Sequence, residues 1–462
     1  MVLPCYRKSL IKSAIPIILF NKDSFDSWIK KQPTITKNWV LQNDFQARAH
    51  EVCYVHDEQG NIAAVLVGIT NVESLWFLSS LPLKLPERVY YLNSELDANA
   101  LQLAVVGWGM GAYQFLRYKK SERNPAVLVL PKESDSENII GIVDAIYMVR
   151  DLVNVPSDDL GPLDLADFAS LLAKQYQASI TNIVENSLLN ELYPAIYTVG
   201  RGSGDAPCLI DMRWGDKNNP KLTLVGKGIC FDSGGLDLKP AKSMRYMKKD
   251  MAGAAHVFAL AKLIMSAKLP VRLRVLVPAA VNAISDLSYH PGDIITMRNG
   301  KTVEIDNTDA EGRLILADAL ADAAAENPDL LIDFATLTGA ASVALGGKIA
   351  AMFSNNNNLA NNVKKVADSE QDPVWHMPLY QKYSKFLDSN IADMKNCADV
   401  PYGSAITAAL FLQKFILPEC DWLHFDIMAF NESDSPGQPH GGEAMMLRGI
   451  FSYLNQRFSV RH

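Results

Sequence analysis

The sequence has few cysteines, and none of them forms a metal-binding or disulfide pattern. Its 462 residues contain six cysteines, with no C-x-x-C motif and no close pair. In a chain of this length such cysteines are typical of free thiols in a reducing compartment. The H-E-x-x-H motif of mononuclear zinc peptidases is also missing. These absences argue against a secreted disulfide-stabilised protein, a thiolate metal site and that class of zinc peptidase.

Long hydrophobic runs and an excess of basic residues are missing as well. No stretch approaches the ~20 apolar residues that a membrane-spanning helix needs. Residues 1–20 lack the uninterrupted apolar core and the small-residue cleavage site of a signal peptide. A formal net charge of −7 gives no support to nucleic-acid binding as the main function. We therefore expect a cytoplasmic protein with no membrane association and no nucleic-acid partner.

What is present is the composition of an ordinary globular protein with an ample core. Hydrophobic residues make up 48% of the chain and charged residues 21%, and the length favours at least two domains. We place a smaller α/β domain over residues 1–145. It carries no recognisable chemistry, so we expect it to serve assembly and access to the site. Its patterns predict strands over 62–67, 89–92 and 126–130, and a helix over 98–118.

Residues 146–462 alternate strand and helix patterns, which predicts a three-layer α/β/α catalytic domain with a mixed sheet. Buried strands are expected over 195–199, 222–225, 273–277, 330–335 and 422–427. Helices are expected over 250–267, 311–325, 404–415 and 442–455. The two segments that concentrate polar chemistry each follow a predicted strand, which is where ligands collect in open α/β sheets.

The first of these segments, N-T-D-A-E-G-R-L at residues 307–314, concentrates charge at the start of a helix. A short extended run precedes it and an apolar helical pattern follows. A single aspartate at such a position is most often a helix cap. Asp309 and Glu311, with Arg313 two residues further on, are more than a cap requires.

The second segment reads V-G-K-G-I-C-F-D-S-G-G-L-D-L-K at residues 225–239. It contributes Lys227, Asp232 and Lys239, and Asp250 opens the next helical run. The four acids Asp232, Asp250, Asp309 and Glu311 would repel one another without a counter-charge. Carboxylates that bridge two divalent ions are a usual arrangement for hydrolysis. Oxygen ligands with one amine suit Zn, Mn, Mg or Co.

The two segments resemble the active-site motifs of the leucine aminopeptidase (cytosolic leucyl aminopeptidase) family. N-T-D-A-E-G-R-L matches the family's signature, and K-G-I-C-F-D-S-G-G is similar to its second active-site motif. Two further motifs follow in order, D-M-A-G-A-A at 250–255 and A-T-L-T-G-A at 335–340. The segment P-G-Q-P-H-G-G-E-A-M-M-L-R at 436–448 resembles a bacterial branch of the family. Several motifs in the right order over residues 145–455 make the resemblance specific.

This resemblance implies two divalent metal ions per subunit, with Mn or Zn as the expected metals. One metal would be held by Asp232, Asp309 and Glu311. The other would be held by Lys227, Asp232, Asp250 and Glu311, so that Asp232 and Glu311 bridge the pair. Lysine ligates only as a free amine, and a nearby metal would drive the loss of its proton. A water bridged by the two metals would be the nucleophile.

The resemblance also implies two catalytic residues that bind no metal. Lys239 is expected to stay cationic and to stabilise the oxyanion. Arg313 is expected to hold a bicarbonate that acts as general base, since its guanidinium suits planar anions. Taken alone, Arg313 could simply pair with Glu304 or Asp306. The implied reaction removes the N-terminal residue of a peptide, because the metals would bind the free amine and the first carbonyl.

The pocket for the N-terminal side chain is expected, from the same resemblance, to involve six residues. These are Met247, Thr336, Leu337, Gly339, Met428 and Asn431. Many family members read D-I-A-G-V-M where this chain reads D-I-M-A-F-N at 426–431. Methionine in place of alanine would narrow or reshape the pocket, and Asn431 would make its far end more polar. We therefore expect no strict preference for leucine, although Met428 could instead be a core residue on a buried strand.

The resemblance implies a homohexamer built as a dimer of trimers. A second interpretation is a non-catalytic regulatory protein that keeps the fold and binds peptides or nucleic acid. The intact metal and catalytic positions favour the enzyme, and the net charge of −7 disfavours the nucleic-acid form. A third interpretation assigns phosphate binding to G-K-G at 226–228, but the spacing does not fit G-x-x-x-x-G-K-[ST].

Overall fold

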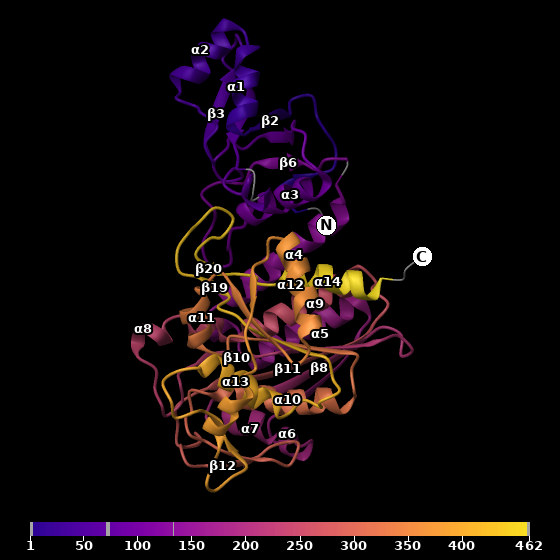
Figure 1. Cartoon of the computed structure of the whole chain (residues 1–462), viewed down its shortest axis with the longest axis vertical. Coiled ribbons are helices and arrows are strands. Elements are labelled where there is room, and N and C mark those ends of the chain that lie inside the picture. Colours follow the sequence, from indigo (N-terminus) through magenta and orange to yellow (C-terminus); the bar gives the residue numbers. More distant parts are fainter. Residues whose placement is uncertain (1–2, 71–73, 133, 460–462) are drawn as a thin grey trace. The chain divides into compact units, whose positions relative to one another are not determined.

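The structure is a computed structural model that describes residues 3–70, 74–132 and 134–459 (Figure 1). The chain divides into two compact units. Unit 1 takes in the chain up to Tyr147 together with Glu432–His440, and unit 2 takes in Met148–Asn431 and the chain from Gly441 onward. The segment 432–440 thus groups with unit 1, although the sequence places it among residues of unit 2. Within the described ranges, no helix is both long and apolar enough to cross a membrane.

Unit 1 is built around a six-stranded sheet with helices packed against it. Its strands are β1 (Tyr6–Arg7), β2 (Ile15–Phe20), β3 (Val52–His56), β4 (Ile62–Gly68), β5 (Val89–Leu92) and β6 (Val127–Val129). They follow the order β1-β6-β5-β2-β4-β3, and all neighbours are parallel except β3 and β4. Its helices include α1 (Lys22–Lys30), α2 (Thr34–Gln42) and α3 (Ala98–Ala112). The prediction of a smaller α/β N-terminal domain is confirmed.

Helix α3 is shorter than predicted and is packed unusually closely. It ends at Ala112, because Tyr113 adopts an extended backbone (φ −61°, ψ 136°), whereas the sequence predicted a helix as far as Tyr118. A Cβ atom at Gly107 or Gly111 would overlap a backbone carbonyl oxygen of a neighbouring segment. These two glycines therefore let the backbone of α3 approach its neighbours more closely than any side chain would allow.

Unit 2 contains a nine-stranded mixed sheet. Its strands are β7 (Ser179–Val184), β8 (Cys208–Trp214), β9 (Lys221–Gly226), β10 (Gly228–Asp232), β11 (Arg272–Asn282), β14 (Leu330–Ala335), β15 (Ala350–Ser354), β16 (Val374–His376) and β18 (Trp422–Asp426). The order is β16-β15-β18-β14-β9-β11-β8-β7, with β10 paired to β11. The central strands β18, β14, β9 and β11 run parallel, while β15 and β8 run antiparallel to their inner neighbours.

Helices cover both faces of this sheet, as Figure 1 shows for unit 2. One face carries α5 (Pro162–Tyr176), α9 (Ala252–Ser266), α12 (Asn357–Ser369) and α14 (Leu447–Phe458). The other carries α7 (Pro194–Gly200), α10 (Glu311–Ala325) and α13 (Ser404–Gln413). The predicted three-layer α/β/α arrangement with a mixed sheet is therefore confirmed.

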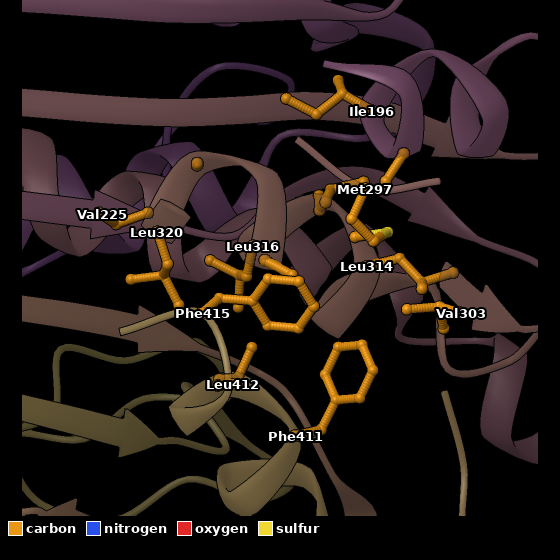
Figure 2. Close-up of a cluster of buried hydrophobic side chains, with 14 of the residues drawn as sticks. Ile196, Val225, Met297, Val303, Leu314, Leu316, Leu320, Phe411, Leu412 and Phe415 are labelled. Atoms are coloured by element: carbon orange, nitrogen blue, oxygen red, sulfur yellow. The ribbon is translucent and has the colours of Figure 1, made fainter. Parts of the chain in front are cut away.

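The core beneath the sheet holds α10 in place. Leu314, Leu316 and Leu320 of α10 are all fully buried. Figure 2 shows them among side chains of α7, β9, α13 and the residues just after α13, namely Ile196, Val225, Phe411, Leu412 and Phe415. Burying a leucine side chain stabilises a fold by roughly 1.5–3 kcal/mol. This packing fixes the helix whose first turn carries Glu311 and Arg313.

The strand predicted over 195–199 is wrong, because these residues form the helix α7. Pro194 occupies the first turn, where its fixed φ and missing N–H favour a helix start. The Asp318 carboxylate accepts a hydrogen bond from the backbone N–H of Ala195 at 2.7 Å, which satisfies a donor that a helix leaves free at its N-terminus. A short apolar run by itself does not distinguish a buried strand from a buried helix.

The last helix also starts later than predicted. The sequence predicted a helix over 442–455, whereas α14 begins at Leu447. Gly441–Gly442 forms the short strand β20, which pairs with β19 (Phe430–Asn431). The Asp372 carboxylate accepts the backbone N–H groups of Met446, Arg448 and Gly449 at 3.0–3.1 Å. A distant aspartate therefore sets the start of α14.

Candidate active site

The two charged segments come together at the carboxyl edge of the parallel strands. Lys227 directly follows β9, and Asp232 is the last residue of β10. Asp250 lies in the 3₁₀ turn η3 (Met247–Met251) that precedes α9. Asp309 and Glu311 lie at the N-terminus of α10, which packs against the same strands. This is the edge where ligands bind in open α/β sheets.

Two lysines lie among the four acids. The Lys227 ammonium is 2.7 Å from Asp250 Oδ2 and 2.9 Å from Glu311 Oε1. The Lys239 ammonium is 2.9 Å from Asp232 Oδ2 and also contacts Asp309 Oδ1. Lys227, Asp232, Asp250 and Glu311 are buried, whereas the side chains of Lys239 and Asp309 are 12% and 32% exposed.

The carboxylates form a compact group with a surplus of negative charge. One carboxylate oxygen from each of Asp232, Asp309 and Glu311 lies within 4.8 Å of the other two. Asp250 joins the group through Lys227. Four carboxylates face the two lysines, so two negative charges are left without a partner within the cluster.

This surplus is visible in the proton affinities of the acids. Burial, reinforced by the neighbouring Asp232, raises the pKa of Glu311 to about 8 and that of Asp309 to about 6. Burial alone would lower the pKa of Lys227, but the surrounding carboxylates raise it above its ordinary value. Both directions follow from excess negative charge in a region shielded from water.

The donor atoms fit a divalent cation. Asp250 Oδ2 and Glu311 Oε1 are buried and lie near the Lys227 ammonium, yet neither accepts a hydrogen bond of good geometry from any described residue. Leaving such oxygens without a partner is costly. Carboxylate oxygens with one amine are ligands that Mn and Zn accept. The residues therefore fit the metal ions that the sequence predicted.

Glycines make room for the lysines and acids. A Cβ atom at Gly312 would overlap the Lys227 side chain at Cε, so only glycine at this position lets Lys227 reach Glu311. Gly234 has φ +88°, and a Cβ atom there would lie 2.6 Å from the carbonyl oxygen of Asp237. Only glycine adopts this backbone readily, which allows the turn that brings Lys239 back toward Asp232.

Arg313 lies in the first turn of α10, two residues after Glu311. Its Nη1 donates to the carbonyl oxygen of Asn396 at 2.9 Å, while its buried Nε has no hydrogen-bond partner among the described residues. The simple pairings with Glu304 or Asp306 do not occur, because Glu304 accepts from Ser389 and Asp306 pairs with a lysine. A buried guanidinium N–H is thus left available for an anion.

Two asparagines that sequence reasoning missed hold the two charged segments in place. Asn282 ends β11, and its amide nitrogen donates to Asp232 Oδ1 at 2.9 Å and to the carbonyl oxygen of Thr308 at 3.0 Å. Asn396 binds the backbone of Asn307 through both its amide oxygen and its amide nitrogen. The sequence feature that could have identified Asn282 is its polar side chain at the carboxyl end of a buried strand. No sequence feature identifies Asn396, since it lies far from the motif at residues 307–314.

Three predicted pocket residues lie just after β14, at the carboxyl edge of the parallel strands. The Thr336 hydroxyl donates to Asp250 Oδ1 at 2.7 Å, and its carbonyl oxygen accepts from Lys227 at 3.1 Å. The Leu337 N–H donates to Asp426 Oδ1 at 2.9 Å. Gly339 is the exposed first residue of α11 (Gly339–Leu345). The structure thus places Thr336 beside a candidate metal ligand, with Leu337 and Gly339 next to it in the chain.

The other three predicted pocket residues lie on η3 and after β18. Met247 begins η3 and is partly exposed. Met428 is partly buried, and Lys249 donates to its carbonyl oxygen at 3.0 Å and contacts its sulfur. Asn431 is buried, with its amide nitrogen donating to Glu443 and its oxygen accepting from Lys348. The contribution of all six residues to substrate binding stays a prediction.

Comparison with known proteins agrees with this geometry. Residues 147–451 match the cytosol aminopeptidase family, catalytic domain, and residues 15–131 match the M17 aminopeptidase N-terminal domain. A probable cytosol aminopeptidase from Syntrophotalea carbinolica is 40% identical over 77% of this chain and 75% of its own length. One from Chlamydia caviae is 40% identical over 75% of this chain and 72% of its own.

Solved structures extend the comparison to the whole fold. The crystal structure of cytosol aminopeptidase from Coxiella burnetii has a TM-score of 0.96 and 44% identity, covering 99% of this chain and all of its own. The bottromycin maturation enzyme BotP in complex with Mn has a TM-score of 0.88 and 29% identity, covering 97% of this chain and all of its own.

The fold and the acid–lysine cluster together define a metal-dependent peptidase that acts at the end of a chain. The protein belongs to the cytosol aminopeptidase family and is an aminopeptidase, a hydrolase. The family resemblance inferred from the sequence is therefore confirmed.

Proposed function

We propose that the protein hydrolyses the N-terminal residue from peptides with a free amino terminus, using two divalent metal ions. The observation that carries this proposal is the group of four carboxylates, three of them buried, around Lys227 and Lys239 at the carboxyl edge of the sheet. Its uncompensated negative charge is what a pair of divalent cations would neutralise.

Five residues would hold the metals. Asp232, Asp309 and Glu311 would bind one ion, and Lys227, Asp232, Asp250 and Glu311 the other. Bound divalent ions would supply Lewis acidity and lower the pKa of a water molecule toward neutrality. Lys227 must give up its proton to act as a ligand, which a nearby cation favours. Mn and Zn suit this donor set, and the Mn complex of BotP supports Mn.

Lys239 and Arg313 would be the two catalytic residues that bind no metal. The neighbouring carboxylates raise the pKa of Lys239 against the opposing effect of burial, so its side chain stays cationic at neutral pH. It can therefore donate to an oxyanion that develops on the scissile carbonyl. The free Nε of Arg313 supports its role in holding a bicarbonate that accepts a proton from the attacking water.

The pocket for the N-terminal side chain would be lined by the six predicted residues. They are Met247, Thr336, Leu337, Gly339, Met428 and Asn431. Met428 is partly buried and held by Lys249, so it would narrow the pocket. Asn431 and its partner Lys348 add polarity. We therefore propose a preference broader than leucine.

The protein would work in the cytoplasm as a homohexamer. The names of its relatives and its free cysteines support the cytoplasm. Sedimentation velocity tests the assembly: a single species of about six times the 50.9 kDa subunit is expected, and a stable monomer would contradict it.

The decisive test is cleavage of a panel of aminoacyl-arylamides by metal-stripped protein with Mn, Zn or Co restored singly. Activity should return with metal and be lost in Asp309→Ala and Lys239→Ala. Asp286→Ala and Lys242→Ala, which replace exposed residues, are the matched controls and should keep full activity. Added bicarbonate should stimulate the wild type but not Arg313→Ala. A folded protein that shows no turnover with any metal would favour the non-catalytic peptide-binding role.

A further inference from the structure

The edge of the nine-stranded sheet opposite the candidate active site contains a cavity of about 280 Å³. β9 and β11 begin at this edge with Lys221 and Arg272, and the antiparallel strand β8 ends there with Trp214. Lys227 and Asn282 lie at the other ends of β9 and β11. The cavity is therefore separate from the metal-binding cluster and is not used by the proposed reaction.

Basic side chains dominate the lining of this amino-edge cavity. Its charged members are Arg213, Lys217, Lys221, Arg272, Arg274 and Glu326. Five cations thus face one carboxylate, in a chain whose net charge is −7. A local surplus of this kind, inside a hollow, concentrates anions from solution.

Two of the cations are compensated and held rigidly. The Asp211 carboxylate lies 3.1 Å from Arg213 Nη2 and 2.8 Å from Arg274 Nη2. Glu326 lies 2.7 Å from Arg213, and Asp322 contacts Arg274 from α10. Paired in this way, the two guanidinium groups hold fixed positions in the lining of the cavity.

Within the described ranges, the other three cations form no close ion pair, although the charge of Arg272 is one of the causes that lower the pKa of Glu326. The Lys221 ammonium donates to the carbonyl oxygen of Glu326 at 2.7 Å. Among the described residues, the side chains of Lys217 and Arg272 make no hydrogen bond and no ion pair. Even with Asp211 and Asp322 counted beside Glu326, the five cations exceed the acids by two.

Two further acids lie near the rim and would balance this surplus in a wider count, so the positive excess belongs to the lining itself. Their carboxylates are directed to backbone groups. Asp329 accepts the N–H of Lys221 at 2.7 Å, and Asp216 accepts the N–H of Asn218 at 2.8 Å. Neither forms an ion pair with Lys217 or Arg272 within the described part of the chain. The side chains of Lys217 and Arg272 are therefore available to bind a ligand.

We propose that the amino-edge cavity is an anion-binding site for inorganic phosphate. Guanidinium groups bind phosphate oxygens in a bidentate manner, and lysine adds a mobile point charge. The cavity volume lies just below the range of pockets for drug-sized ligands, which suits a small oxyanion. Arg272 and Lys217 would bind it directly, while Arg213 and Arg274 supply a fixed positive field.

The test is isothermal titration of the full-length, metal-loaded protein with inorganic phosphate, with ionic strength held constant by chloride. The wild type is compared with the double variant Arg272→Gln/Lys217→Gln. The matched control is Arg88→Gln/Lys365→Gln, which removes two exposed cations elsewhere. Circular dichroism and aminopeptidase activity should be unchanged in both variants, because none of these residues belongs to the catalytic cluster.

We expect saturable binding in the wild type and the control, and an affinity at least about tenfold weaker in the cavity variant, since charge-assisted hydrogen bonds are lost. Arg272→Lys/Lys217→Arg should recover part of the affinity. Absence of saturable binding to the wild type would overturn the proposal. Equal affinity in the cavity variant would also overturn it, because phosphate would then bind elsewhere, for example at Arg313.

Discussion

The two edges of the nine-stranded sheet are built from the same strands but carry opposite charge. At the carboxyl edge, three buried acids and the partly exposed Asp309 face Lys227 and Lys239. At the amino edge, basic side chains outnumber acids around a cavity. In both places part of the charge is paired within the chain and part is not. The unpaired part distinguishes a binding site from an ionic network that only supports the fold.

The networks differ in what holds their charges. At the amino edge, Asp211 lies between two arginines, which stay protonated at any physiological pH. At the carboxyl edge, Glu311 shares one lysine with Asp250, and its pKa is raised to about 8, first by burial and then by Asp232. An acid with a raised pKa is destabilised without a further cation. Removing an acid should therefore have opposite effects on stability at the two edges.

Glu311→Gln should have the largest effect on activity. We propose that both metals share this carboxylate, so its loss would remove several kcal/mol of electrostatic stabilisation and kcat/KM should fall by about 10³-fold or more. Steady-state kinetics with saturating Mn measures this. Activity within tenfold of the wild type would contradict the role of Glu311 as a bridging ligand.

Lys239→Ala should lower kcat by about 10²–10³-fold with little change in KM, because in the proposed mechanism its ammonium acts on charge that develops only in the transition state. Metal content, measured by atomic absorption, should stay near that of the wild type, because the proposal does not make Lys239 a ligand. A variant that loses its metal instead would show that Lys239 mainly orders Asp232 and Asp309.

Gly312→Ala tests the space around Lys227. The added methyl would overlap the lysine side chain and displace it from Glu311, so metal affinity should fall by about 10–100-fold. Gly204→Ala is the control, because a Cβ atom there has no neighbour within 4 Å. Competition with a chelator measures both affinities. Equal values for the two variants would mean that Lys227 does not need its observed position.

Asp211→Asn should destabilise the fold by about 2 kcal/mol, because it leaves Arg274, which is 6% exposed, with one anionic partner fewer. Urea denaturation of metal-free protein gives the value. A change below about 0.5 kcal/mol would mean that solvent screens this network.

Glu311→Gln should show the opposite sign in the same metal-free experiment. The folded pKa of Glu311 lies above its unfolded value, at about 8. Its stabilising contribution is therefore present below the unfolded pKa and is lost as pH rises toward 8, by up to about 1.4 kcal/mol per pH unit. The glutamine variant should lose less stability between pH 5 and pH 8 than the wild type. Parallel pH profiles would exclude this charge effect.

The sequence predicted the layers of the fold because apolar runs and helical patterns are local. The runs at 222–225 and 330–335 appear as the central strands β9 and β14, and the helix predicted over 311–325 is α10. The strand predicted over 195–199 was wrong, because an apolar run this short does not distinguish a strand from a helix. The carboxylate of Asp318, more than a hundred residues away, caps it as a helix.

The sequence by itself determined which acids and lysines occur in the active-site motifs, since the order and spacing of such motifs are properties of the chain. Only the tertiary structure decided which of them meet, and that Asn282 and Asn396 hold them in place. It also decided that Lys217 and Arg272 share a cavity, although neither belongs to a motif. The physical reason is that hydrogen bonds and charge act through space, across strands joined by crossovers, and leave no periodic trace along the chain.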